Sequence, residues 1–244
     1  MNEHEKVSEI IRLKDEAPLD FDPWRSALLV IDMQRYFISP DYPFAQALEK
    51  LVPGATAGYF ERVRETVMSN VRRLLEAFRA AERPVVFTGT GSYTEDGREL
   101  PQWLKDFDQL GLALLGQRIW PHVDDPSWQI DDSVAPREGE LVLHKTSSGP
   151  LNSTRLDQTL HNLGVTSLVV AGLTTDVCVT QTARETADRG FRVVVAEDAC
   201  TTLSEEMHRA ALLAFSLAFG RVRSTDEVLA LLSAEEKSAS VSWS

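Results

Sequence analysis

The 244-residue sequence predicts an α/β fold: a doubly wound (Rossmann-like) three-layer α/β/α arrangement around a mainly parallel six-stranded sheet. Short apolar runs rich in β-branched residues alternate with segments whose apolar residues recur every three or four positions. Such alternation is typical of a parallel sheet with helices on both faces. At 43% hydrophobic residues, the chain suits one domain with a full core.

Each element can be placed in order along the chain. The expected strands are 26–32, 84–88, 140–145, 165–171, 191–196 and 221–223. The expected helices are 57–83, 154–163, 178–189, 205–219 and 225–232, of which 57–83 has the clearest apolar stripe. We therefore predict an extended N-terminal arm at 1–26, a domain at 27–232 and a flexible Ser-rich tail at 233–244.

Residues 91–138 form a long connection that is expected to be irregular and is rich in aromatic residues. A connection of this length in a compact domain usually carries function or an assembly surface. Two interpretations stay open here with equal weight. The segment forms a wall or lid of the substrate pocket, or it forms an interface between subunits, where aromatic residues are also enriched.

Composition excludes several kinds of partner. The formal net charge of −12 argues against nucleic acid, which needs a basic face. No apolar run approaches the ~20 residues that cross a bilayer, and the N-terminus has no apolar core of a secretory signal. Cys178 and Cys200 do not amount to a disulfide framework, so we expect a reducing cytoplasm. The expected partner is a small molecule.

Three chemistry-bearing residues follow expected strands: Asp32, Lys145 and Cys178. The carboxyl ends of parallel strands face the ligand crevice of an open sheet, so these side chains should meet there. Each residue also has a plainer interpretation. Asp32 suits a turn or helix cap, Lys145 suits a charged surface, and Cys178 suits a small apolar side chain packed at the sheet end.

Cys178 is expected where a strand turns into a helix. Exposed backbone N–H groups and the helix dipole favour negative charge at that end, and therefore thiolate over thiol. The same N–H groups can stabilise an oxyanion. A nucleophile, a base and a cation at one edge indicate covalent acyl transfer.

The chain resembles the isochorismatase-like cysteine hydrolases, which include nicotinamidases, N-carbamoylsarcosine amidases, ureidoacrylate amidases and biuret hydrolases. The resemblance covers residues 27–232 and rests on Leu29-Val30-Ile31-Asp32-Met33-Gln34, on Lys145 and on Gly172-Leu173-Thr174-Thr175-Asp176-Val177-Cys178-Val179. It implies that Cys178 is the nucleophile, Asp32 the general base and Lys145 the third catalytic residue. It also implies a cis peptide between Leu173 and Thr174, with the N–H groups of Thr174 and Cys178 forming an oxyanion hole.

The resemblance further implies an amidohydrolase that forms a thioester and releases ammonia or an amine, and a homo-oligomer (dimer or tetramer). Metal-binding nicotinamidases carry histidines that residues 88–95 lack, so we predict no metal and no cofactor. Many relatives carry aromatic residues after the lysine, where this chain has small and polar groups at 148–152. That change favours a ureido or carbamoyl (biuret-like) substrate over a flat aromatic amide. Phe37, Leu151, Asn152 and Thr175 are the expected substrate-binding residues.

Two other functions remain open from the sequence. The Asp32–Phe37 segment also resembles true isochorismatases, which cleave a vinyl ether with the aspartate and need no cysteine. A non-catalytic binding module of the same fold is the other alternative, although all three catalytic positions are filled.

Overall fold

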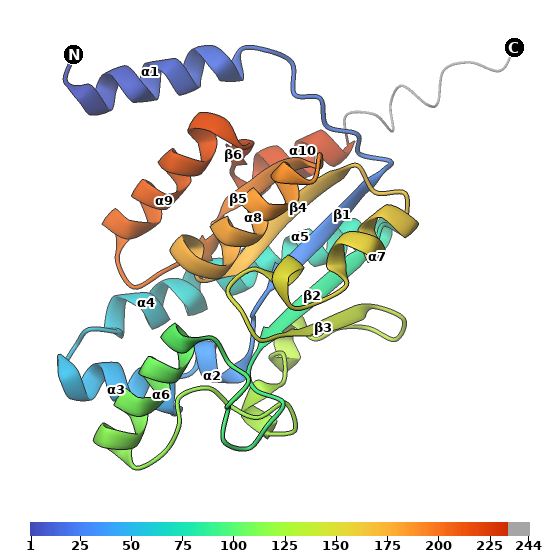
Figure 1. Ribbon diagram of the computed structural model, residues 1–244. Coiled ribbons are helices and arrows are strands. Elements are labelled where there is room, and N and C mark those ends of the chain that lie inside the picture. Colours follow the sequence, from blue (N-terminus) through green and yellow to red (C-terminus); the bar gives the residue numbers. More distant parts are fainter. Residues whose placement is uncertain (234–244) are drawn as a thin grey trace, which may run out of the picture.

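The computed structural model describes residues 1–233, and its six strands form one sheet in the order β3-β2-β1-β4-β5-β6 (Figure 1). The strands are β1 (Ser26–Ile31), β2 (Val85–Thr90), β3 (Leu141–Lys145), β4 (Ser167–Leu173), β5 (Arg192–Thr201) and β6 (Arg221–Arg223). All neighbouring strands pair in parallel. The chain runs outward from β1 to β3, then restarts at β4 on the other side of β1. This reversal confirms the predicted doubly wound sheet and creates a crevice at the carboxyl ends of β1 and β4.

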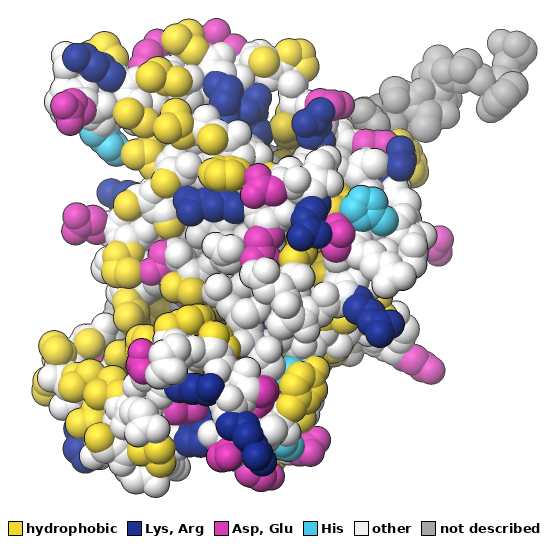
Figure 2. Space-filling model, viewed as in Figure 1, with side chains coloured by type: hydrophobic (Ala, Val, Ile, Leu, Met, Phe, Trp, Pro, Cys, Tyr) yellow, Lys and Arg dark blue, Asp and Glu magenta, His cyan; other side chains and the backbone are white. Residues whose placement is uncertain are grey.

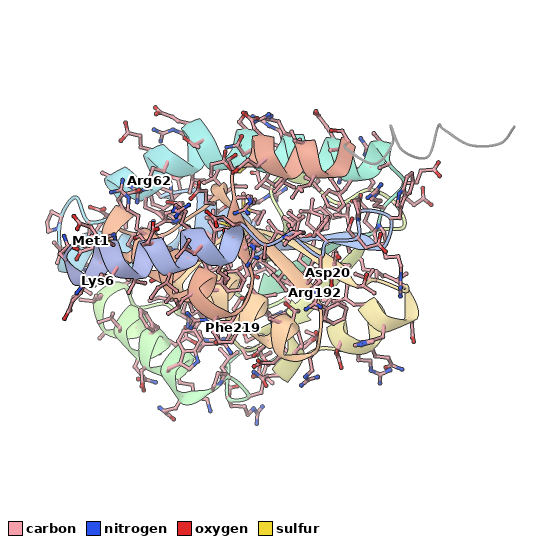
Figure 3. All side chains as sticks on the ribbon, turned by 90° about the horizontal axis from the view of Figure 1, so that it is seen from above. Met1, Lys6, Asp20, Arg62, Arg192 and Phe219 are labelled. Carbon is pink, nitrogen blue, oxygen red and sulfur yellow. The ribbon has the colours of Figure 1, made fainter. Side chains whose placement is uncertain are left out.

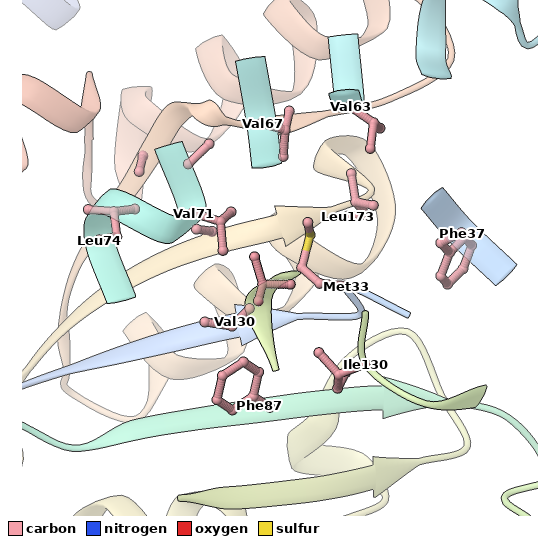
Figure 4. Close-up of a cluster of buried hydrophobic side chains, with 14 of the residues drawn as sticks. Val30, Met33, Phe37, Val63, Val67, Val71, Leu74, Phe87, Ile130 and Leu173 are labelled. Carbon is pink, nitrogen blue, oxygen red and sulfur yellow. The ribbon is translucent and has the colours of Figure 1, made fainter. Parts of the chain in front are cut away.

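Helices cover both faces of the sheet, as predicted (Figure 1). One face packs against α5 (Met68–Ala80) and α10 (Thr225–Ser233), and the other against α7 (Leu156–Asn162), α8 (Thr180–Asp188) and α9 (Glu205–Ala218). Successive residues of β1 alternate between the two cores: Val30 joins the first and Leu29 the second. Figure 4 shows Val30 and Phe87 facing Val71 and Leu74 of α5 within the first core.

The predicted helix 57–83 is a continuous helical segment with a wider turn inside it. It consists of α4 (Ala57–Arg62), a π-helical turn η1 (Val63–Val67) and α5. Its apolar residues are buried against the sheet, as the stripe in the sequence indicates. The segment ends at Ala80, a few residues earlier than predicted.

The N-terminal segment is not the extended arm that the sequence indicated, because residues Glu3–Asp15 form helix α1. Asn2 caps this helix, and the Glu5 side chain accepts a hydrogen bond from the Asn2 backbone in return. No residue of α1 is buried, and its signals in the sequence, the capping-box spacing of Asn2 and Glu5 and the helical spacing of Val7, Ile10 and Ile11, were not recognised. Its end is fixed by ion pairs from Asp15 to Arg221 (3.0 Å) and Arg223 (2.9 Å). Figure 3 shows α1 lying over the domain, with Met1 and Lys6 in its N-terminal part.

The segment 91–138 is also more regular than predicted. It contains α6 (Gln102–Leu115) and short 3₁₀ turns at Pro126–Trp128 and Asp132–Val134. Helices α2 (Arg35–Ile38) and α3 (Pro43–Leu51) precede it, and α6 packs against α3 rather than against the sheet. Figure 2 shows apolar side chains gathered over α3 and α6, at the lower left of the view. Helices α2, α3 and α6 therefore lie beside the crevice.

Close backbone packing between β1 and β4 depends on Gly172. Its φ is +121°, and a Cβ atom there would lie 2.1 Å from the carbonyl oxygen of Ile31. Because the obstacle is backbone, it cannot rotate away as a side chain would. Glycine is therefore the residue that lets the end of β4 lie against β1.

We expect Gly172→Ala to lower the melting temperature by several degrees more than Gly116→Ala. Both glycines have positive φ, but a Cβ at Gly116 meets nothing within 4 Å, so the control isolates the collision from the backbone cost. In a domain of this size about 1 kcal/mol corresponds to a shift of roughly 2–4 °C. Equal shifts in thermal unfolding would show that the close approach at Gly172 has no special cost.

No helix among residues 1–233 is long and apolar enough to cross a membrane. Ser233 closes α10, and the rest of the predicted tail, 234–244, lies outside the described residues.

Candidate active site

The structure brings Asp32, Lys145 and Cys178 into contact, as the strand ends predicted. Asp32 follows β1, Lys145 ends β3, and Cys178 lies in the π-helical turn η5 (Thr175–Val179) between β4 and α8. The Lys145 Nζ lies 2.8 Å from Asp32 Oδ2 and 3.4 Å from Cys178 Sγ. Asp32 and Lys145 are fully buried and Cys178 is 5% exposed. The plainer interpretations of a cap carboxylate and a surface lysine are therefore wrong.

Two threonines of β2 hold the Asp32 carboxylate. Thr88 Oγ1 donates to Oδ1 at 2.8 Å, and Thr90 Oγ1 donates to Oδ2 at 2.9 Å. Asp32 itself has a φ of +51°, a left-handed conformation that aspartate tolerates better than most residues. Both hydroxyls lie on one face of β2 because they are two residues apart. The Thr-Gly-Thr sequence at 88–90 was the available signal for this support, and it was not recognised.

Gln34 fixes the end of β2 from the opposite side. Its amide nitrogen donates to the carbonyls of Thr90 (3.0 Å) and Trp128 (2.8 Å), and its amide oxygen accepts from the Thr90 N–H at 2.7 Å. The side chain is fully buried and its amide is bonded at both ends. Gln34 thereby sets the position of the Thr90 hydroxyl that supports Asp32.

Lys145 is the buried cation of the site. Its ammonium donates to Thr90 Oγ1 and to the Ser147 carbonyl at 2.9 Å, besides its contacts with Asp32 and Cys178. Burial by itself would lower the pKa of Lys145, but the Asp32 carboxylate, together with the contact to Cys178, outweighs it and raises that pKa. The lysine is therefore charged at neutral pH and can hold negative charge on the sulfur.

The burial of the Cys178 thiol works against its ionisation. Burial raises the pKa of Cys178 to about 12; Lys145 lowers it in part, and Asp32 raises it further. Desolvation opposes the thiolate that the helix end was expected to favour, so the role of the helix end stays a prediction. A base must remove the thiol proton, and the Asp32 carboxylate is close enough to hydrogen-bond with Cys178, a contact that itself raises the pKa of the thiol.

The loop that carries the cysteine has the predicted geometry at one point. The Leu173–Thr174 peptide bond is cis, as the family resemblance implied. The Cys178 carbonyl accepts from Thr182 Oγ1 at 2.6 Å, which joins η5 to α8. Single π-helical turns are frequent at functional sites. The oxyanion-hole role of the Thr174 and Cys178 N–H groups stays a prediction.

A cavity of about 400 Å³ leads to Cys178. Thr90, Ser148, Thr174 and Asp176 line its polar part near the sulfur. The larger part is apolar and comes from α2, α3, α6 and the start of α9. The expectation of small, polar pocket walls is therefore wrong: aromatic walls are present, but they come from segments other than 148–152.

The four predicted substrate-binding residues divide into two groups. Phe37 lines the cavity. The other three face other partners: Asn152 donates to Glu185 at 2.6 Å, Thr175 pairs with His208 Nδ1 at 2.8 Å, and Leu151 packs against the second core. None of these three residues lines the cavity, so the structure does not support their predicted role in substrate binding.

Among residues 1–233 no three or more His, Cys, Asp or Glu side chains gather where they could hold a metal ion. Metal independence stays a prediction, and dialysis against a chelator should leave the rate unchanged. Parallel dialysis without chelator controls for losses in handling. A tightly bound zinc or iron ion in stoichiometric amount, whose return restores lost activity, would refute it.

The six-stranded parallel sheet, with a buried Asp–Lys–Cys contact at its crevice, places the chain among the doubly wound α/β proteins. Sequence comparison then identifies its family. The family model described as "Isochorismatase domain" matches residues 26–227. The chain therefore belongs to the isochorismatase family.

Individual relatives agree with that assignment. The chain is 31% identical over 197 residues to nicotinamidase 3 of Arabidopsis thaliana, covering 80% of this chain and 81% of the relative. It is 29% identical over 224 residues to a ureidoacrylate amidohydrolase of Methylobacterium radiotolerans, covering 84% and 78%. An isochorismatase family protein from Burkholderia thailandensis superposes with a TM-score of 0.66 at 27% identity, covering 87% of this chain and 97% of that one.

Proposed function

We propose that this protein is a cysteine-dependent amidohydrolase. It cleaves the C–N bond of a ureido or carbamoyl compound through a thioester on Cys178 and releases ammonia or an amine. The observation that carries the proposal is the buried contact of Asp32, Lys145 and Cys178 at a ligand-sized cavity. Relatives named as ureidoacrylate amidohydrolase and nicotinamidase support the same reaction class.

The first half of the reaction forms the thioester. Asp32 takes the proton of the Cys178 thiol, whose raised pKa means that a base is needed to ionise it. The sulfur attacks the carbonyl carbon, and the carbonyl electron pair moves onto oxygen, where the N–H groups of Thr174 and Cys178 stabilise it. Asp32 then returns the proton to the departing nitrogen. The C–N bond breaks, and the acyl or carbamoyl group stays on sulfur.

The second half releases the acid. Asp32 is again a carboxylate, so it can take a proton from a water molecule that attacks the thioester carbonyl. The C–S bond breaks, the sulfur takes the proton back, and the product leaves. Lys145 stays charged through both halves and steadies whichever of Asp32 and Cys178 is negative. One amide and one water give one acid and one ammonia or amine.

The experiment that tests the proposal combines ammonia release from a panel of small amides and ureas with alkylation by iodoacetamide. Alkylation is followed over a range of pH, because the thiolate is the form that reacts. A cysteine hydrolase loses its activity. If the protein cleaves a vinyl ether and alkylation does not affect that activity, it is an isochorismatase instead. If it turns over no compound, it is a binding module.

The cellular setting belongs to the same proposal. Both cysteines are free and buried, which supports a reducing, cytoplasmic compartment. A homo-oligomer stays a prediction, supported by the apolar side chains that α6 exposes, Trp103, Phe107 and Leu112.

A further inference from the structure

The walls of the cavity above Cys178 are mostly apolar. Three aromatic side chains come from α2, α3 and the loop that follows α6, and two more come from α6 itself. The apolar lining residues are Phe37, Phe44, Leu48, Trp103, Leu104, Phe107, Trp120, Val177, Leu203 and Met207. Several rings touch one another: Trp120 lies 5.9 Å from Phe107 and 6.1 Å from Phe37, centroid to centroid. These residues form an aromatic cup that opens toward the sulfur.

The cup contains one carboxylate and no cation. Among the described residues that line the cavity, Asp176 is the one acid, and neither lysine nor arginine is present. The Asp176 Oδ1 atom is buried without a hydrogen-bond partner. A buried carboxylate oxygen without a donor is costly unless a ligand supplies one.

These walls select against the most polar substrates. A bare ureido compound is polar over its whole surface, and aromatic walls would leave its outer N–H and C=O groups unpaired. A carboxylate beside the ureido group would meet Asp176, a like charge, and no cation. An apolar group, by contrast, would be removed from water by the cup.

We propose that the substrate is an uncharged carbamoyl or amide compound with a bulky aryl or branched alkyl substituent. The substituent occupies the aromatic cup, and Asp176 is the specificity residue that accepts a substrate N–H and excludes carboxylates. This inference rests on the proposed function, because it places the reacting carbonyl at Cys178.

The test compares three ureas by ammonia release: methylurea, 1-phenylethylurea, and N-carbamoylphenylglycine, in which a carboxylate replaces the methyl group of 1-phenylethylurea. We expect kcat/KM for 1-phenylethylurea to exceed that for methylurea by at least about tenfold, from burial of the ring. We expect the carboxylate compound to be at least about tenfold poorer than 1-phenylethylurea. A preference for methylurea or for the carboxylate would overturn the inference.

Two variants, each with a matched control, test which residues cause the preference for the phenyl group and the discrimination against the carboxylate. Asp176→Asn should reduce the discrimination against N-carbamoylphenylglycine by about fivefold or more, since it removes the like charge. Asp188→Asn, an exposed acid on α8, should not. Trp103→Ala should reduce the preference for the phenyl compound, and Trp24→Ala, which lies outside the cavity, should not. Unchanged ratios in Asp176→Asn and Trp103→Ala would overturn the assignment.

A binding measurement separates failure of this inference from failure of the proposed function. Calorimetry with Cys178→Ala measures the affinity of the three ureas without turnover. If wild type hydrolyses none of them but the variant binds 1-phenylethylurea most tightly, the selectivity of the cavity is supported and the proposed function is wrong. If wild type hydrolyses methylurea best, the function stands and the inference is wrong. If there is neither turnover nor binding, both are wrong.

Discussion

Cys178→Ala is expected to lose turnover while keeping its fold, because Cys178 is the one thiol among the described residues that line the cavity. The measurement is ammonia release, with circular dichroism and thermal unfolding to show that the fold is intact. Residual activity above about one hundredth of wild type would contradict the covalent mechanism.

Cys200 provides a matched control for that experiment. It is also a free, buried cysteine, 4% exposed against 5% for Cys178. It lies near the carboxyl end of β5, the strand beside β4. It makes no contact with Lys145 or Asp32, so Cys200→Ala should change the rate little. If Cys200→Ala is the inactive variant instead, the wrong thiol has been assigned.

Asp32→Asn is expected to slow both thioester formation and its hydrolysis by about 10²–10⁴-fold, the range that general acid–base groups contribute. Asparagine keeps the shape of the side chain but cannot take the proton of the thiol or of the attacking water. Single-turnover measurements of both halves check this. A defect confined to one half would show that Asp32 serves only that step.

Lys145→Ala should act through the charge of the site rather than through proton transfer. Lys145 lowers the pKa of Cys178, so its removal should raise that pKa and move the alkylation profile to higher pH. Asp32 raises the same pKa, so Asp32→Asn should move the profile to lower pH although catalysis is lost. Profiles of both variants that match wild type would show that neither charge acts on the sulfur.

The sheet was predictable because its signal is local. Buried parallel strands such as Ser26–Ile31 read as continuous apolar runs, and α5 shows a clear apolar stripe. Helix α1 was missed, although Val7, Ile10 and Ile11 have helical spacing and Asn2 and Glu5 have the spacing of a capping box. None of its residues is buried, and ion pairs of Asp15 hold its end. Helix α6 packs on α3 rather than on the sheet, and Gly111 inside it weakens the helical signal.

The contact of Asp32, Lys145 and Cys178 was predictable because each residue lies at or after the end of a strand, and the sheet topology brings these strand ends together. What surrounds them was not. The Asp32 supports Thr88 and Thr90 depend on strand pairing, which sets β2 beside β1. The protonation of Cys178 depends on burial, which sequence position does not reveal. The aromatic cup depends on how α3 and α6 fold over the crevice, far along the chain from the lysine.

The most direct test of the account is the chemical identity of the intermediate. The enzyme is quenched with acid while it turns over a urea or amide that it hydrolyses slowly. It is then digested, and the masses of its peptides are measured by mass spectrometry. The account predicts that the peptide containing Cys178 gains the mass of the acyl or carbamoyl group, and that neutral hydroxylamine removes it, as expected for a thioester. Continued turnover with no such adduct, or an adduct on the Cys200 peptide, would contradict it.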